Sequence, residues 1–249
     1  MMSTQQNLLT VKASQTDRRR VRNQIRKLRR EIPQDVRRAA DDRICRTFQN
    51  LEPFQNAGLV AGFLAFDGEA DPLQLMTAAF EAGKSVYVPV IIGRNLPLMF
   101  SPWSPQAPLA PNKFGIAEPI SKSKSDPTSD PTSADLLQPA GLTSQGKRDE
   151  YHESWKHPHE IDFVIHPLVA FDSHCRRIGV GGGYYDRSFP PVIPNHVQSN
   201  EDQASVKRPG PRLFGFAYEI QQVGSIEINP WDRVLDGVIT ERKLYRSFR

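Results

Sequence analysis

Residues 161–187 read IDFVIHPLVAFDSHCRRIGVGGGYYDR, the most informative stretch of this 249-residue chain. Its first half, residues 163–171, is a short apolar run rich in branched and aromatic side chains, with Asp162 before it and Asp172 after it. Such a run is typical of a buried strand in a parallel sheet. We therefore expect a buried strand that leads, through a turn, into the second half of the stretch.

The second half is rich in glycine and lies between Arg177 and the string Tyr184-Tyr185-Asp186-Arg187. Four glycines fall within five positions: Gly179, Gly181, Gly182 and Gly183. Neighbouring glycines let the backbone reach positive φ angles and approach a ligand closely, with several N–H groups directed at one anion. The pattern predicts a phosphate-binding loop, whereas a glycine run without the flanking residues would be equally typical of a flexible turn.

The spacing excludes two well-known nucleotide loops. A Walker A loop requires Gly-Lys-Ser/Thr, and a dinucleotide-binding fingerprint requires its third glycine where Tyr184 stands. Arg177 can instead pair with phosphate oxygens in fork geometry. Asp186 could hold a magnesium ion that already carries phosphates.

A strand–helix–strand unit precedes this stretch. Residues 59–66 and 85–91 are apolar and predict strands, and residues 73–80 between them predict a helix with Asp71 as its N-cap. Successive units of this kind imply a parallel sheet, in which ligands bind beyond the carboxyl ends of the strands. The acidic loop 67–71 lies at that end, although turn and cap chemistry also explains its residues. Further strands are expected at residues 99–100, 213–218 and 234–240.

Residues 18–48 are strongly basic and helical in pattern. An apolar stripe recurs every three or four residues, at Val21, Ile25, Leu28 and Ile32. Pro33 separates this helix from a second one. The simplest interpretation is an amphipathic helix pair with a solvated basic face. A nucleic-acid-binding surface is the alternative, but it usually has aromatic residues among the arginines, and none precedes Phe48.

The amino-acid composition limits the kinds of protein that this chain could be. The net charge of +4 and sequence pI of about 9.1 favour anionic partners without choosing between nucleic acid, membrane and nucleotide. Two cysteines, Cys45 and Cys175, cannot build a disulfide framework and fit a reducing compartment. No apolar run approaches the roughly 20 residues of a membrane span. We expect a cytoplasmic protein whose residues 1–17 form a disordered extension; a transit peptide is the weaker alternative.

Two low-complexity insertions are predicted, at residues 121–158 and 190–211, because their composition cannot bury enough apolar surface to offset chain entropy. His152, His157 and His159 raise the possibility of a metal site in the first insertion. No cysteine or well-spaced carboxylate completes a ligand set there, so we favour a simple loop.

The string PLVAFDSHCRRIGVGGGYYDR, residues 167–187, resembles the signature of the 5-formyltetrahydrofolate cyclo-ligase family, also called 5,10-methenyltetrahydrofolate synthetases. In that family a strand ending in Ala-Phe-Asp leads to an Arg-x-Gly-x-Gly-x-Gly-Tyr-Tyr-Asp loop. The resemblance continues in order from about Arg18 to about Thr240, interrupted by the two insertions. It implies a single Rossmann-like, three-layer α/β domain over residues 18–249, with a mostly parallel central sheet and helices on both faces.

The resemblance also implies a reaction. Members convert 5-formyltetrahydrofolate with ATP and Mg²⁺ to 5,10-methenyltetrahydrofolate, ADP and phosphate, through a phosphorylated N5-formyl intermediate. We therefore expect Mg²⁺ as cofactor and ATP as co-substrate. The expected partners are the folate and ATP, with neither nucleic acid nor membrane, in a monomer or a homodimer.

Carried over residue by residue, the resemblance assigns four sets of site residues. The residues expected to bind ATP are Arg18, Arg22, Arg177, Gly179, Gly181, Gly182, Gly183, Tyr184 and Tyr185. Those expected to bind the folate are Leu64, Glu69, Val180, Gly181, Gly182, Gly183 and Tyr184. Catalysis is assigned to Arg177 and Tyr184, and magnesium binding to Asp186 and Asp232. Val180 and Gly182 stand where some members carry basic residues, which puts the affinity for ATP in question more than the activity.

Overall fold

The computed structural model describes residues 12–14, 17–112, 115–120, 154–191 and 210–247. Most of the predicted extension and of both predicted insertions lies outside these residues. Of the extension, β1 (Lys12–Ala13) is described and pairs in parallel with β11 (Ser225–Ile226). At the end of the first insertion, Lys156 forms an isolated β-bridge with Phe100.

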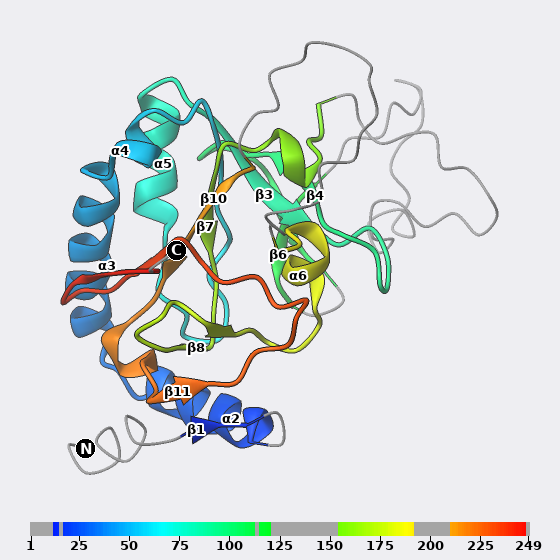
Figure 1. Cartoon of the computed structure of the whole chain (residues 1–249). Helices are drawn as coiled ribbons and strands as arrows, with labels where there is room; N and C mark the ends of the chain where they lie inside the picture. Colours follow the sequence, from blue (N-terminus) through cyan, green and yellow to red (C-terminus); the bar gives the residue numbers. More distant parts are fainter. Residues whose placement is uncertain (1–11, 15–16, 113–114, 121–153, 192–209, 248–249) are drawn as a thin grey trace.

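A seven-stranded sheet forms the centre of the molecule, in the order β13-β12-β10-β7-β2-β3-β4 (Figure 1). The strands are β2 (Leu59–Ala61), β3 (Ser85–Val90), β4 (Met99–Pro102), β7 (Phe163–His166), β10 (Arg212–Phe216), β12 (Gly237–Ile239) and β13 (Leu244–Arg246). Neighbours run parallel throughout, except that β4 and β13 are antiparallel edge strands. This confirms the predicted α/β class with a mostly parallel sheet.

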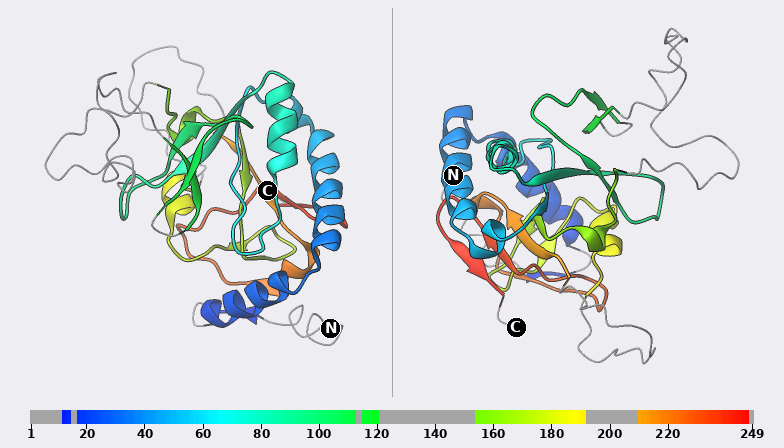
Figure 2. Two further views of the ribbon diagram at one scale, coloured as in Figure 1. Left: turned by 180° about the vertical axis from the view of Figure 1, so that it is seen from behind. Right: turned by 90° about the horizontal axis from the view of Figure 1, so that it is seen from above.

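The two faces of the sheet are packed differently. The main helices are α2 (Arg18–Arg30), α3 (Gln34–Gln49), α4 (Glu52–Gln55) and α5 (Leu73–Glu81). Helices α3, α4 and α5 cover one face, where Phe48 and Phe54 pack against Phe163. On the other face Val164 packs with the chain that follows β7, which includes the hairpin of β8 (Ala170–Phe171) and β9 (Arg177–Ile178) and the short helix α6 (Tyr184–Ser188) (Figure 2).

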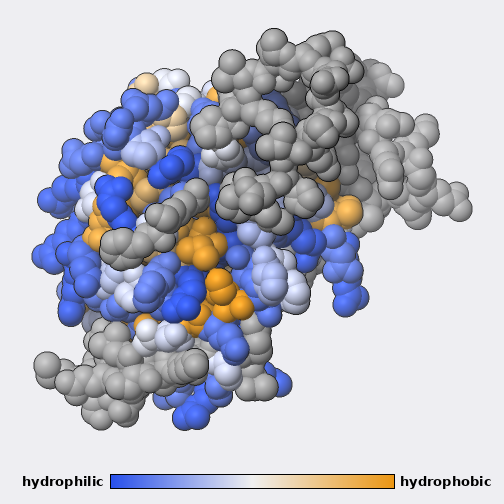
Figure 3. Space-filling view, in the orientation of Figure 1, coloured by the Kyte–Doolittle hydropathy of each residue, from blue (hydrophilic) through white to orange (hydrophobic). Residues whose placement is uncertain are grey.

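The remaining elements are small. They are the antiparallel pair β5 (Leu109–Pro111) and β6 (Ala117–Pro119), and the 3₁₀ turns η2 (Pro158–Glu160) and η3 (Glu219–Gln221). His157 and His159 stack with ring centroids 5.5 Å apart, and His152 lies outside the described residues. On the face seen in Figure 1, hydrophilic residues cover most of the described surface and hydrophobic residues gather near its centre (Figure 3).

Three predicted strands differ from the observed ones. The apolar run 163–171 is two strands rather than one, because Pro167 has no N–H to continue the ladder after β7. The predicted strand 59–66 ends its pairing at Ala61. The strand at residues 237–239 is not the last one, since β13 follows it and returns antiparallel at the edge.

The order of the strands creates a switch point between β2 and β7. From β2 the chain moves to β3 on one side, and from β7 it moves to β10 on the other. In open α/β sheets ligands bind beyond the carboxyl ends of strands at such a point. Among the described residues, no helix is both long and apolar enough to cross a membrane.

The close packing of β10 gives a stability prediction. A Cβ at Gly215 would lie 2.6 Å from Cδ2 of Leu168 and 3.1 Å from Cδ1 of Leu235. Gly215→Ala should therefore overpack this face and lower the free energy of unfolding by about 1–3 kcal/mol, measured by urea denaturation. At Gly210 a Cβ would meet nothing within 4 Å, so Gly210→Ala is the matched control and should change stability by less than about 0.5 kcal/mol. Equal effects of the two variants would contradict the described packing.

Candidate functional site

Helix α2 brings a row of arginines to the carboxyl ends of β2 and β7. Its buried stripe consists of Val21, Ile25 and Arg29, the last only 1% exposed. The Nη1 of Arg29 donates to the carbonyl oxygen of Leu168, just after β7, at 3.3 Å. Its Nη2 donates to the carbonyl oxygen of Asp67, in the loop after β2, at 3.2 Å. The predicted apolar stripe is therefore largely right, but it also contains a buried arginine that the prediction did not include.

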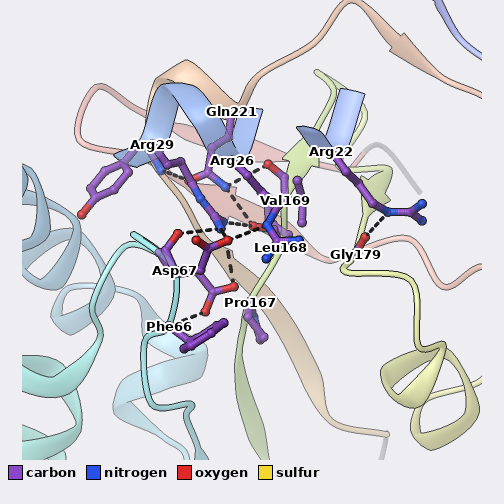
Figure 4. A network of polar contacts seen from close by, with 12 residues as sticks. Arg22, Arg26, Arg29, Phe66, Asp67, Pro167, Leu168, Val169, Gly179 and Gln221 are labelled. Carbon is purple, nitrogen blue, oxygen red and sulfur yellow. Dashed lines mark hydrogen bonds and ion pairs between the residues drawn. The ribbon is translucent and has the colours of Figure 1, made fainter. Parts of the chain in front are cut away.

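The loop after β2 makes a tight turn at Asp67 and Gly68, whose φ angles are 54° and 71°. The Asp67 carboxylate binds Arg26 (Figure 4) and also Arg30, with Nε–O distances of 2.5 Å in both pairs. Burial tends to raise the pKa of Asp67, but the hydrogen bonds from Arg30 and Arg26 outweigh it and leave this pKa below its ordinary value. Ion pairs with α2 thus hold the turn in place.

Glu69 is the next acidic residue of this turn. Its Oε2 accepts a hydrogen bond from the Phe66 backbone N–H at 3.2 Å, and its Oε1 lies 3.8 Å from Nη1 of Arg29. The side chain is 13% exposed. Burial raises the pKa of Glu69, and Arg29 opposes this shift. The carboxyl group therefore follows the carboxyl end of β2, next to the switch point, with the Arg29 guanidinium beside it.

The glycine loop follows β9 and ends at the first turn of α6. Gly181 and Gly183 have φ angles of 110° and 67°, a region that side-chain-bearing residues rarely adopt. Nε of Arg22, on α2, donates to the carbonyl oxygen of Gly179 at 2.8 Å. A Cβ at Gly181 would lie 3.5 Å from Cζ of Arg22. The loop therefore lies directly against α2, as the predicted phosphate site requires.

Two aspartates and two arginines flank the loop. Nη2 of Arg177 binds Oδ1 of Asp186 at 2.6 Å, and its Nη1 donates to the carbonyl oxygen of Arg233. Nη2 of Arg18 binds Oδ2 of Asp232 at 2.9 Å. Burial lowers the pKa of Arg177, while Asp186 and, less strongly, Asp232 oppose this shift. Both expected magnesium ligands therefore lie within the electrostatic reach of one buried arginine.

Among the buried polar atoms that lack a hydrogen-bond partner within the described residues are Nε2 of His166 and the hydroxyl of Tyr185. The two rings are 4.2 Å apart. Nδ1 of His166 lies 2.6 Å from the Pro167 carbonyl oxygen, so Nδ1 carries the proton and Nε2 presents a lone pair. Burial raises the pKa of Tyr185; the neighbouring Glu69 raises it further and Arg177 lowers it. Tyr185 thus lies within the electrostatic reach of both Glu69 and Arg177.

Most of the predicted site residues come together. The glycine loop, its flanking arginines and aspartates, and Tyr185 form one region, to which Glu69 is linked as described. Tyr184 lies beside them with its ring 4.9 Å from the Arg187 guanidinium, and Val180 is 68% exposed at the loop tip. Leu64 instead packs, partly buried, against the core under α3 and α5. Its contact with the folate, like the catalytic role of Tyr184, stays a prediction.

Sequence reasoning missed Arg29 and His166. Arg29 stands four residues after Ile25 and eight after Val21, so the helical period already placed it on the buried stripe. His166 is the last residue of β7, where a buried strand meets the switch point, but nothing in the sequence indicated an unpartnered ring nitrogen.

A pocket of about 520 Å³ lies elsewhere, at the amino ends of β10 and β12. Its lining residues are Asn50, Leu51, Glu52, Pro53, Asn56, Arg212 and Arg246. It contains none of the predicted site residues, so its volume alone does not make it the better candidate.

Comparisons with known proteins bear on this geometry. A family model described as the 5-formyltetrahydrofolate cyclo-ligase family matches residues 14–148 and 132–241. The 5-formyltetrahydrofolate cyclo-ligase of Escherichia coli (strain K12) is 28% identical over 222 residues, which cover 89% of this chain and 98% of that protein. The Haemophilus influenzae cyclo-ligase is 26% identical over 217 residues, covering 86% and 92% respectively.

Two solved structures share the fold. The NMR structure of Aquifex aeolicus 5,10-methenyltetrahydrofolate synthetase has a TM-score of 0.63 and 22% identity, with 92% of each chain covered. The 5,10-methenyltetrahydrofolate synthetase of Mycoplasma pneumoniae has a TM-score of 0.55 and 18% identity, covering 90% of this chain and 99% of its own. Because the family model spans the whole region from Arg18 to Asp232, the chain belongs to the 5-formyltetrahydrofolate cyclo-ligase family.

Proposed function

We propose that the protein converts 5-formyltetrahydrofolate with ATP and Mg²⁺ to 5,10-methenyltetrahydrofolate, ADP and phosphate. The observation that carries the proposal is the glycine loop packed against α2, with Arg22 on the carbonyl oxygen of Gly179 and Arg177 beside Asp186. Such a loop surrounded by cations suits the phosphates of a nucleotide. Its neighbour Glu69 supplies a carboxylate for the N–H donors of a pterin ring. The names of the cyclo-ligase relatives support the same reaction.

Magnesium fits the donor groups at this site. Asp186 and Asp232 offer carboxylate oxygens, the ligand type that Mg²⁺ prefers, and the cation commonly keeps several waters and binds through one or two carboxylates plus substrate phosphates. The described residues contain no group of three or more metal-binding side chains, so phosphate oxygens would have to complete the coordination. When bound there with ATP, magnesium would neutralise charge on the phosphates.

The chain's own residues would then align the reactants. Arg22, Arg18 and Arg177, with the N–H groups of the glycine loop, would hold the phosphates in line with the formyl oxygen. The γ-phosphoryl group passes to that oxygen, which converts it into a good leaving group. The neighbouring folate nitrogen, N10, attacks the formyl carbon and loses its proton, and the C–O bond breaks to release phosphate. No side-chain nucleophile is required, and Tyr184 would position the formyl group.

Two alternatives remain testable. A nucleotide-binding module without ligase activity would bind ATP but make no product. A nucleic-acid-binding protein would use the arginines of α2 and α3. Several of those on α2 are engaged within the fold: Arg18 with Asp232, Arg22 with Gly179, and Arg26 with Asp67. We therefore expect little nucleic-acid binding at physiological salt.

The direct test is an absorbance assay for the methenyl product. Purified protein with 5-formyltetrahydrofolate and ATP should form product only when Mg²⁺ is present, and a chelator should abolish the signal. Asp186→Ala should lower kcat/KM by roughly two orders of magnitude, the size expected when one charge-stabilising group is removed. Glu81→Ala, at the exposed end of α5, is the matched carboxylate control and should leave activity within about twofold. ATP binding without product formation would overturn the ligase proposal.

The phosphorylated intermediate makes a separate prediction. If the formyl oxygen of the folate is labelled with ¹⁸O, the label should appear in the released inorganic phosphate, because the oxygen that accepts the phosphoryl group leaves with it. Mass spectrometry of the phosphate measures this transfer. Product formation with an unlabelled phosphate would rule out phosphorylation of the formyl oxygen while leaving the overall reaction intact.

A further inference from the structure

Arg29 is a buried cation at the centre of the polar network in Figure 4. Its two terminal nitrogens donate to the carbonyl oxygens of Leu168 and Asp67, at 3.3 and 3.2 Å. Its Nη1 also lies 3.8 Å from Oε1 of Glu69. One guanidinium therefore joins three points of the chain, and two of them belong to the turn that carries Glu69.

The contact with Leu168 is shared with another side chain. Nε2 of Gln221 donates to the carbonyl oxygens of Leu168 and Val169, at 2.8 and 3.1 Å. The segment after β7 therefore keeps a hydrogen-bond donor even without Arg29. The contacts that depend on Arg29 are therefore those with the acidic turn.

Within that turn, the two acidic residues depend on Arg29 to different degrees. Asp67 has direct ion pairs with Arg26 and Arg30, whereas Arg29 lies 3.9 Å from it. Among the described residues, Glu69 forms its ion pair with Arg29 alone. Burial disfavours the charged form of Glu69, and Arg29 is the strongest influence that opposes this. Removing Arg29 would leave a largely buried carboxylate without its compensating charge.

We propose that Arg29 is a positioning residue for folate recognition, which holds the Glu69 carboxylate at the carboxyl end of β2 so that it can accept hydrogen bonds from the N–H donors of the pterin ring. This inference rests on the proposed function. Arg29 acts through Glu69 rather than by touching the reacting atoms. Since α2 also carries Arg22 and Arg18, the same helix positions groups for both substrates.

The test compares two arginine variants of one helix. Arg29→Gln should raise KM for 5-formyltetrahydrofolate at least about tenfold, the effect of weakening a hydrogen bond to a charged group, and leave KM for ATP within about twofold. Arg30→Gln is the matched control, because Arg30 is exposed, pairs with Asp67 rather than with Glu69, and leaves the Asp67–Arg26 ion pair to hold the turn. It should leave both KM values within about twofold.

A double-mutant cycle separates positioning from general loss of structure. The four proteins are the wild type, Arg29→Gln, Glu69→Gln and the double variant Arg29→Gln/Glu69→Gln. Thermal unfolding is measured for each, and calorimetry without ATP measures its affinity for the folate. The double variant buries no unpaired charge and should regain stability lost in Arg29→Gln, yet bind folate no better than Glu69→Gln. If Arg29→Gln weakens folate binding equally in both backgrounds, or raises both KM values together, the inference fails.

These outcomes are distinct from failure of the proposed function. A wild-type protein that turns over normally, with an Arg29→Gln variant unchanged in folate KM, overturns the role of Arg29 alone. A wild-type protein that binds folate without turnover overturns the ligase proposal, and the binding cycle still decides the role of Arg29. A wild-type protein that binds no folate overturns both.

Discussion

Arg29 carries a positive charge although it is only 1% exposed. This buried charge lies where α2 meets the carboxyl ends of β2 and β7. Burying a cation is costly unless carboxylates and carbonyl oxygens surround it. The acidic turn after β2 and the Leu168 carbonyl after β7 provide these groups, and their contacts with Arg29 join the last turns of α2 to both strand ends. Arg18 and Arg22 stand eleven and seven residues earlier, which places all three arginines on one helix face. The two earlier arginines have contacts of their own, Arg22 with the glycine loop and Arg18 with Asp232.

The helices and the parallel sheet could be predicted from the sequence. Apolar periodicity correctly predicted α2, α3 and α5, and the strand–helix–strand order correctly predicted the parallel sheet. Local composition predicted the wrong strand bounds in some places. Pro167 interrupts an apolar run that otherwise looks like one strand, and the residues beyond Ala61 stay apolar although their ladder has ended. Strand propensity describes a pleated, buried environment, and it cannot specify where the pairing partner stops.

The sequence could indicate which residues belong to the candidate site, but not which of them pair with one another. The glycine-rich pattern pointed to Arg177 and Asp186, and the family resemblance to Asp232, but the ion pair of Arg18 with Asp232 joins positions more than two hundred residues apart. Arg29 was overlooked because periodicity reports which face of a helix is buried, whereas the identity of the partner depends on the tertiary fold. An arginine on an otherwise apolar stripe was the available signal, since a buried cation needs carboxylate or carbonyl partners somewhere in the fold.

In the proposed function, the glycine loop and the acidic turn are two halves of one site held together by α2. Hydrogen–deuterium exchange of the intact chain with MgADP, with 5-formyltetrahydrofolate, and with both ligands tests this claim most directly, because no turnover occurs. MgADP should slow exchange in residues 179–188, and the folate should slow it in residues 63–70, with α2 protected most when both are bound. Protection confined to the pocket around Asn50 and Arg246, or folate protection that omits residues 63–70, would contradict the account.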